Sequence, residues 1–209
     1  VSLQMTTSTQ TLAFTNGEKR YEPGTNYSQD RWDDFYATQG GDGNWTAPIA
    51  NYREMEKLYD GLSLDADKEG YLLFMETGRI FLFDQATQMV DMWGDIPFSE
   101  AGLLNKNGAP MLPKYDEGKQ VYDSAFFHLK RISNWLATTT PQQFYLSKLA
   151  KQDVLFKGDL TKWRRYANSL LLRLAMRISY VDETTAQALV QEILGNPTRY
   201  PLLDNITDN

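Results

Sequence analysis

The sequence predicts an all-α protein built from stacked antiparallel helical hairpins. Apolar residues recur at helical spacing in five or more segments, and short connectors that contain glycine or proline separate them. Hydrophobic residues make up 42% of the 209-residue chain and aromatic residues 13%, which is enough for one sizeable core. Amphipathic helices joined by short loops bury their apolar faces by packing in pairs, so helical hairpins follow.

The first helices are expected after an irregular start. Residues 1–28 are rich in Thr, Asn and Gly and show no sustained period. Residues 31–36 predict a helical turn, which the glycine-rich segment 38–45 interrupts. A helix from about Ala47 to Asp60 follows, because proline at position 48 suits a first helical turn and glycine at position 61 ends it.

A long buried helix is predicted from roughly Asp67 to Trp93. Its apolar residues lie nearly all round the helix, which is typical of a helix in the middle of a bundle. Gly94 and Pro97 end it, and an irregular connector with two prolines follows at residues 105–113.

Further helices are expected in the second half of the chain. Asp116 is placed to cap a helix that ends near Thr138. Residues 142–157 predict a weaker helix and a turn. Asp182 is placed to cap a last helix, which Gly195 ends.

The strongest helical pattern lies in residues 158–179. Asp159 is placed to cap its first turn, and Gly158 permits a sharp entry. One face of the helix carries an unbroken apolar stripe, which comprises Trp163, Tyr166, Ala167, Leu170, Leu171, Leu174, Ala175 and Ile178. We expect other helices to cover this stripe.

Two carboxylates have competing interpretations. Arg173 and Arg177 stand one helical turn apart and repel each other unless carboxylates lie between them, so Asp91 or Asp95 is a predicted partner. The same two aspartates could form the acid pair of an all-α glycoside hydrolase module, which needs two carboxyl groups close together. Gly94 and Pro97 end the helix beside them, so capping and ion pairing require fewer assumptions.

Charge and composition exclude several functions. The net charge is −6 and the pI is about 4.9, which argues against a nucleic-acid binder and against attraction to an anionic membrane. The chain contains no cysteine, so disulfides, thiolate metal sites and a thiol nucleophile are excluded. No uncharged apolar run approaches the roughly 20 residues that span a bilayer.

Three ordered motifs resemble the SusD and RagB family, particularly its SusD-like branch. The motifs are DMWGDIPFSEAG at 91–102, PKYDEGKQVYDSAFFHLKRI at 113–132 and GDLTKWRRYANSLLLRLAMRIS at 158–179. The resemblance implies helices stacked in tetratricopeptide-like pairs. Because members of the family are longer than this chain, we expect residues 1–209 to form a single SusD-like domain that is an N-terminal portion of a longer protein. Its helical-repeat part would cover about 47–195.

The resemblance also implies a function. Family members are non-catalytic lipoproteins on the outer face of the outer membrane, held there by a lipidated N-terminal cysteine. They bind a glycan, an oligosaccharide or another nutrient and pass it to a TonB-dependent, SusC-like transporter. No cofactor and no nucleic acid is implied. The signal peptide and the lipidated cysteine are not in this sequence.

The candidate ligand residues are Trp45, Trp32, Tyr36 and Asn44, in or beside the glycine-rich segment. Sugars stack their C–H faces on aromatic rings and form hydrogen bonds at the rim. The family's ligand residues vary with the ligand, so this prediction rests on the residues and not on a motif. The alternative is that Trp32 and Tyr36 only anchor the segment to the core.

Other sequence patterns are weaker evidence for a functional site. The segment Asp65–Glu76 approaches a calcium-loop template, but it also continues as buried helix. His128 is the only histidine, which excludes sites with several histidine ligands and favours a structural role. A helical scaffold that binds only protein is a further alternative, and an exposed aromatic cluster on a helix face would favour it.

Overall fold

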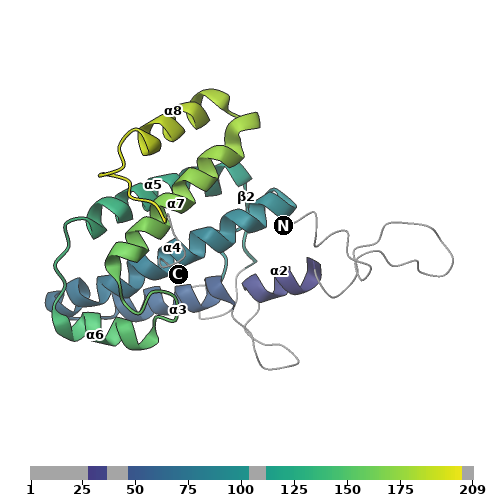
Figure 1. Cartoon of the computed structure of the whole chain (residues 1–209). Coiled ribbons are helices and arrows are strands. Elements are labelled where there is room, and N and C mark those ends of the chain that lie inside the picture. Colours follow the sequence, from purple (N-terminus) through teal and green to yellow (C-terminus); the bar gives the residue numbers. More distant parts are fainter. Residues whose placement is uncertain (1–27, 37–46, 104–111, 204–209) are drawn as a thin grey trace. The chain divides into compact units, whose positions relative to one another are not determined.

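The computed structural model describes residues 28–36, 47–103 and 112–203, and these residues are mostly helical (Figure 1). The elements are α2 (Ser28–Tyr36), α3 (Pro48–Asp60), α4 (Asp65–Trp93), β1 (Ile96–Pro97), β2 (Tyr115–Asp116), α5 (Gly118–Leu136), α6 (Gln143–Gln152), α7 (Leu160–Arg177), the 3₁₀ turn η1 (Ile178–Tyr180) and α8 (Glu183–Leu194). The predicted helical fold is confirmed. The short strand pair was not predicted.

The chain divides into two compact units. Unit 1 comprises the described residues of Val1–Met55 and Gln85–Gly118, and unit 2 comprises Glu56–Asp84 and the described residues of Lys119–Asn209. Helices α3 and α4 contribute residues to both units. Among the described residues, no helix has the length and apolar character that a membrane crossing requires.

In unit 1, a tight turn separates α4 from β1. Gly94 ends α4 with a φ of +78°, a conformation that residues with a side chain rarely adopt. Strand β1 then pairs antiparallel with β2, with Ile96 opposite Asp116. The first N–H of α5, that of Gly118, donates to Asp95 Oδ1 at 2.9 Å. Asp95 therefore fastens the start of α5 to the end of α4.

The predicted role of Asp116 as the cap of α5 is wrong. Its carboxylate instead accepts hydrogen bonds from the Phe98 and Ser99 N–H groups at 3.0 and 2.6 Å, and from the Ser99 hydroxyl at 2.8 Å. Burial raises the pKa of the Asp116 carboxyl, but these donors outweigh burial and the pKa lies below its ordinary value. Asp116 holds the loop after β1, which the sequence pattern around it does not reveal.

In unit 2, α6 packs against the first half of α4. Leu73, Tyr145 and Leu149 form a buried cluster. The Tyr145 ring lies so close to Gly70 that a Cβ atom there would meet it at 2.2 Å, and its hydroxyl donates to Asp67 at 2.7 Å. The segment Asp65–Glu76 is therefore packed helix and not a calcium loop, and its glycine serves close packing.

Helix α7 begins as predicted. Asp159 accepts hydrogen bonds from Thr161 N and Lys162 N. Before it, Gly158 has a φ of +79° and lies against Ala150, where an added Cβ would meet backbone and side-chain atoms at 3.0 Å. The stripe predicted for this helix is largely buried, and its buried members are Trp163, Ala167, Leu170, Leu171, Leu174 and Ala175.

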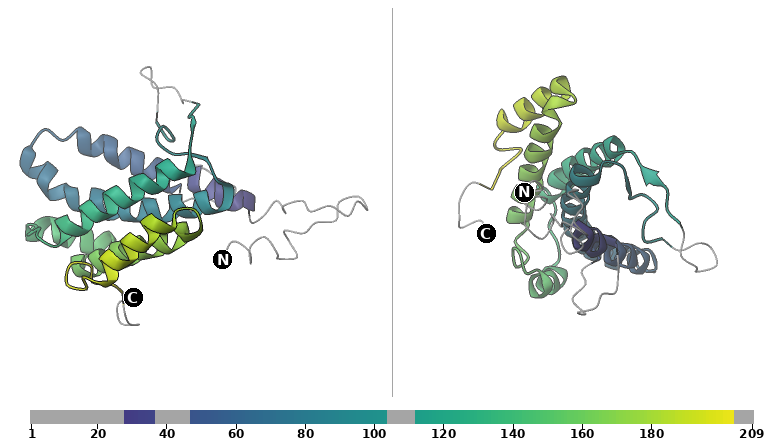
Figure 2. Two further views of the ribbon diagram at one scale, coloured as in Figure 1. Left: turned by 90° about the horizontal axis from the view of Figure 1, so that it is seen from above. Right: turned by 90° about the vertical axis from the view of Figure 1, so that its right-hand side faces the viewer.

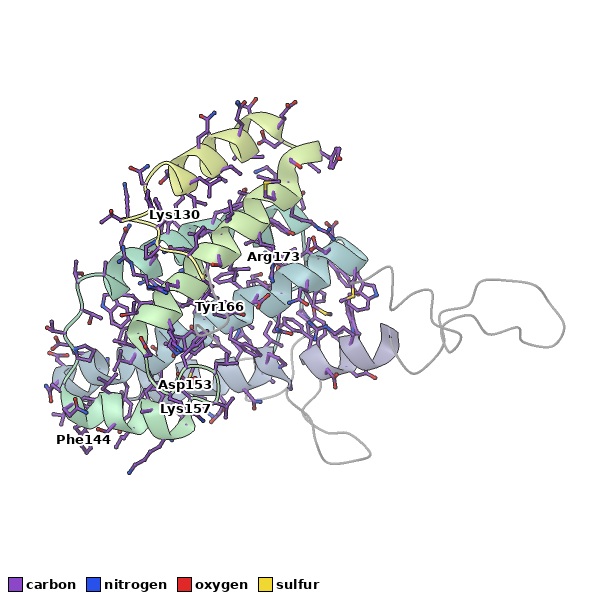
Figure 3. All side chains as sticks on the ribbon, viewed as in Figure 1. Lys130, Phe144, Asp153, Lys157, Tyr166 and Arg173 are labelled. Carbon is purple, nitrogen blue, oxygen red and sulfur yellow. The ribbon has the colours of Figure 1, made fainter. Side chains whose placement is uncertain are left out.

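A buried carboxylate closes the turn between α6 and α7. Asp153 accepts hydrogen bonds from the N–H groups of residues 155, 156 and 158 and from Trp163 Nε1, at 2.7–3.0 Å. Burial raises the pKa of the Asp153 carboxyl, but the four donors outweigh it and leave the pKa below its usual range. Figure 3 labels Asp153 at this turn. The tryptophan of the GD-x-x-KW motif is thus tied to the turn before its own helix.

The acidic neighbour of Arg173 on α7 is Asp84. Tyr166 and Arg173, which Figure 3 labels along α7, both donate to its buried carboxylate. Burial and the nearby Asp84 charge raise the pKa of the Tyr166 hydroxyl, so it remains a donor. An acidic partner was predicted correctly for Arg173, but the residue is Asp84 and not Asp91 or Asp95.

Helix α8 returns beside α7, as both views of Figure 2 show. Asp182 caps it as predicted, accepting from Thr185 N at 3.0 Å. Ala186, Leu189 and Ile193 are buried on one face. Lys130 of α5 forms a 2.6 Å ion pair with Glu192 of α8. This α7–α8 pair is one of the predicted antiparallel hairpins.

Candidate functional site

Three aromatic side chains meet where α2 packs on the end of α4 in unit 1. The ring centroids of Trp32 and Tyr36 lie 4.7 Å apart, and those of Trp32 and Trp93 lie 5.4 Å apart in an edge-on arrangement. Each of the three side chains is partly exposed. We call Trp32, Tyr36 and Trp93 the aromatic group.

Helix α2 presents its two rings from a fixed position. Phe35 is buried, with 3% of its surface exposed, and its ring packs edge-on against Tyr36. The Tyr36 hydroxyl donates to the Pro97 carbonyl at 2.7 Å. Burial, with smaller contributions from Tyr115 and Asp116, raises the pKa of the Tyr36 hydroxyl, so it stays protonated and keeps this bond. Tyr36 is therefore tied to the chain after α4, and part of its ring remains exposed.

Trp93 is the last residue of α4, and the loop that follows it is held in place by two side chains. Arg53 of α3 donates to the carbonyls of residues 98, 99 and 101 at 3.0–3.1 Å. Asp116 binds the same loop through the N–H groups of residues 98 and 99. These contacts hold the loop on two sides, and Trp93 lies one residue before the turn at Gly94 that begins it. Residues outside the motif at 91–102 thus fix the loop that begins directly after Trp93.

A cluster of polar side chains joins the same two helices, α2 and α4, and its α4 residues precede Trp93 in the sequence. The Arg31 guanidinium donates to Gln85 Oε1 at 2.7 Å and to Gln88 Oε1 at 3.2 Å. All three side chains are partly exposed. We call Arg31, Gln85 and Gln88 the donor cluster. Aromatic rings and hydrogen-bonding groups thus lie along one helix–helix contact.

This arrangement suits a ligand with apolar faces and polar edges. Partly exposed rings offer flat surfaces to the C–H face of a sugar, and the donor cluster offers N–H groups at the side. Two of the predicted ligand residues, Trp32 and Tyr36, are brought together here. The other two, Trp45 and Asn44, lie outside the described residues. Trp93 was not predicted as a ligand residue, because its motif indicated architecture and its neighbour Trp32 lies far away in sequence.

The alternative sites receive no support from the described residues. No cluster of three or more His, Asp or Glu side chains in the described ranges could hold a metal ion. Asp95 accepts the Gly118 N–H, which is a structural role. His128 stacks on Phe83 with ring centroids 5.5 Å apart, and burial with the nearby Arg79 and Arg131 lowers its pKa to about 4.

Comparison with known proteins identifies the kind of molecule. Residues 2–209 match the SusD-like family described as starch-binding and associating with the outer membrane. A SusD-like protein from Bacteroides thetaiotaomicron superposes with a TM-score of 0.67 at 21% identity, over 95% of this chain and 36% of the other, which shows the shared fold. No protein with a curated functional description matches.

Two further solved structures are similar at slightly higher identity. A SusD homologue from Parabacteroides distasonis has a TM-score of 0.62 and 26% identity, over 86% of this chain and 33% of the other. A chitin-binding protein has a TM-score of 0.65 and 25% identity, over 88% and 33%. The chain spans about a third of the length of these structures. Since the family match extends over residues 2–209, the chain belongs to this SusD-like family of proteins that associate with the outer membrane, whose members are not enzymes.

Proposed function

We propose that this chain is part of a cell-surface lipoprotein that captures glycans without cleaving them and delivers them to a TonB-dependent, SusC-like transporter. The family match over residues 2–209 carries this proposal. The chitin-binding protein among the similar structures supports a glycan as the ligand. We further propose that residues 1–209 form one SusD-like domain, with its helical repeats at about 47–195, and that a longer protein continues it and bears the lipid anchor.

We assign the ligand contacts to Trp45, Trp32, Tyr36 and Asn44, as predicted, and add Trp93. The contacts among Trp32, Tyr36 and Trp93 support the addition. A sugar ring stacked on either tryptophan would lose its contact when the indole is removed. Binding should therefore depend on the aromatic group and should tolerate the loss of a tryptophan elsewhere.

Affinity gels and calorimetry against a panel of soluble polysaccharides test the proposal. We expect Trp32→Ala and Trp93→Ala to weaken binding of the retained glycan about tenfold or more, which corresponds to about 1.4 kcal/mol. Trp135→Ala is the matched control, because Trp135 is a partly exposed tryptophan of α5 in unit 2. A panel with no bound glycan would remove the glycan assignment.

Two further measurements separate the alternatives. Release of reducing sugar that stops in Asp91→Asn would favour a glycoside hydrolase. Co-purification with a TonB-dependent transporter from outer membranes tests the proposed partner. Failure to recover any transporter, with the glycan still bound, would remove the delivery role and leave capture.

A further inference from the structure

The ammonium group of Lys148, on α6 in unit 2, is held by aromatic side chains. Its Nζ lies 4.3 Å from the centroid of the Phe144 ring, which Figure 3 labels on α6, and 5.3 Å from that of Tyr71 on α4. It also donates to the Tyr71 hydroxyl at 2.8 Å. A surface lysine has a flexible stem, so these contacts fix a positive charge that would otherwise move freely.

No carboxylate neutralises this charge within the described ranges. Neither Lys148 nor its neighbour Lys151 forms an ion pair there, and α6 contains no acidic residue. On α4, the carboxylate of Asp67 faces α6 but accepts a tyrosine hydroxyl of that helix. Asp65 and Glu69 are each two residues from Asp67, which is about 200° round the helix, so both lie on its far side.

The free hydrogen-bonding groups around Lys148 are mainly donors. An ammonium has three N–H groups and accepts nothing, and Tyr71 takes one of them. The O–H of Tyr71 itself has no acceptor among the residues that the structure describes. Lys151 lies within about 60° of Lys148 and of Phe144 round the helix, so its ammonium belongs to the same side of α6.

The Phe144 ring supplies an apolar surface beside these donors. Its side chain is 60% exposed, although Lys148 contacts it. A sugar can therefore stack its C–H face on this ring while a charged group at its edge meets the lysines. We call Tyr71, Phe144, Lys148 and Lys151 the α6 surface.

We propose that the α6 surface is a second glycan site, which binds acidic sugars through the carboxylate or sulfate group that they carry. The inference rests on the proposed capture of glycans. An anionic oxygen accepts charge-assisted hydrogen bonds from both lysines, and such bonds are about twice as strong as neutral ones. Residues 143–177 hold eight of the chain's 21 Lys and Arg residues but only two of its 27 Asp and Glu residues. This part of an acidic chain therefore attracts anions.

An anionic membrane fits the α6 surface less well than a sugar does. A helix that lies in a membrane interface buries a continuous apolar face among the lipids. Among the ten residues of α6, all of them described, Phe144 is the only large apolar side chain that is mostly exposed. One ring is enough to stack on a sugar, but it does not make an apolar helix face.

Two matched pairs of oligosaccharides test the proposal by calorimetry. Hexagalacturonate and its methyl ester share one backbone and differ in the charge of each carboxyl group. Sulfated and unsulfated maltohexaose differ in the same way for sulfate, so the pairs distinguish the two anionic groups. We expect the charged member of at least one pair to bind about tenfold or more tightly than its neutral partner. This preference should shrink when the salt concentration rises from about 0.05 to about 0.5 M.

Substitution of the lysines tests the assigned residues. We expect Lys148→Gln and Lys151→Gln each to reduce the preference about threefold or more, and the double variant to abolish it. Lys148→Arg keeps the charge and should retain most of the preference. Lys119→Gln, at a 75% exposed position on α5, lowers the net charge equally and should leave the preference unchanged. Phe144→Ala should weaken binding of the charged sugar through lost stacking.

Each outcome decides the inference. Equal binding within both pairs, an unchanged preference in the double variant, or its loss in Trp93→Ala of unit 1 would overturn a separate acidic site while glycan capture stands. Binding to phosphatidylglycerol vesicles that the double variant loses, without binding of a charged hexasaccharide, would overturn it in favour of a membrane. If the polysaccharide panel retains the protein but no charged hexasaccharide binds, the inference falls and the proposed function survives. If no glycan binds at all, both fall.

Discussion

At the scale of single residues, Asp153 is a buried aspartate whose carboxylate holds a turn together, unlike an aspartate on the surface of a turn. One carboxylate accepts four N–H groups, and three of them belong to the backbone of the turn before α7. We expect Asp153→Asn to lower the free energy of unfolding by about 2–3 kcal/mol, because the amide NH₂ would face donors and leave at least one buried N–H without a partner. Urea unfolding followed by circular dichroism measures this.

Asp159→Asn is the control for Asp153→Asn. Asp159 also accepts two backbone N–H groups, but at an exposed helix cap where asparagine performs as well as aspartate. A loss of equal size in the two variants would show that the buried turn is no more demanding than an ordinary cap.

Stability should respond to pH in two separate windows. His128 is the only histidine, and burial with Arg79 and Arg131 lowers its pKa from 6.5 to about 4. The unfolded chain binds a proton in this window that the folded chain does not, so the free energy of unfolding falls as pH drops from 6.5 towards 4. Asp153 and Asp116, whose folded pKa values lie below the ordinary value, stabilise the fold above the unfolded pKa and lose this effect at lower pH.

The variant His128→Gln separates the two windows. Glutamine does not titrate, so we expect the loss between pH 6.5 and about 4 to shrink while the loss at lower pH remains. Urea midpoints measured across the pH series test this. An unchanged slope in the upper window would mean that His128 titrates alike in the folded and unfolded chain.

At the scale of elements, sequence patterns predict what is local. Asp159 and Asp182 cap helices as expected, because a cap needs only the three residues that follow it. Asp116 stands before a helix in the same way, yet it binds the loop after β1, since a partner distant in sequence offered two N–H groups and a hydroxyl. The strand pair β1–β2 was missed for the same reason.

The entry to α7 gives a prediction for a whole element. Gly158 combines a φ of +79° with close contact to Ala150, so an alanine side chain meets both strain and crowding. We expect Gly158→Ala to destabilise the fold by about 1–2 kcal/mol from the backbone conformation, and further through the contact at 3.0 Å. Thermal unfolding measures the change.

Gly61→Ala is the matched substitution at the end of α3. Gly61 has no positive φ, and its added Cβ would come no closer than 3.4 Å to a neighbour. We expect little effect there, or a small stabilisation from reduced freedom of the unfolded chain. Comparable losses at the two glycines would refute a special conformation at the α7 entry.

At the scale of the whole molecule, the candidate site shows which contacts a single sequence can predict and which it cannot. The i, i+4 spacing of Trp32 and Tyr36 places them on one face of a short helix, so their pairing was foreseeable. The contact between Trp32 and Trp93 and the donor cluster both join α2 to α4. No local sequence pattern predicts which face of one helix packs against which face of another. The three motifs indicated the family because they specify its helical scaffold. They carry no information about the ligand.

The scaffold and the site should therefore respond separately to substitution. Asp84 lies in unit 2, where it accepts from Tyr166 and Arg173, whereas the aromatic group lies in unit 1. Arg173 is half exposed and regains water when its partner is removed, so we expect Asp84→Asn to cost only about 1–2 kcal/mol of unfolding free energy. Its affinity for the retained glycan should stay within a factor of about two, because no ligand contact is assigned to it.

Trp93→Ala should show the reverse pattern. Its indole is partly exposed, so its loss should cost less stability than that of a buried tryptophan and should weaken glycan binding about tenfold. Thermal unfolding and calorimetry on both variants test the pair together. If Asp84→Asn weakened glycan binding as strongly as Trp93→Ala at a temperature where both are folded, unit 2 would take part in the site, and the assignment of ligand contacts to α2 and the end of α4 would have to be extended to α7.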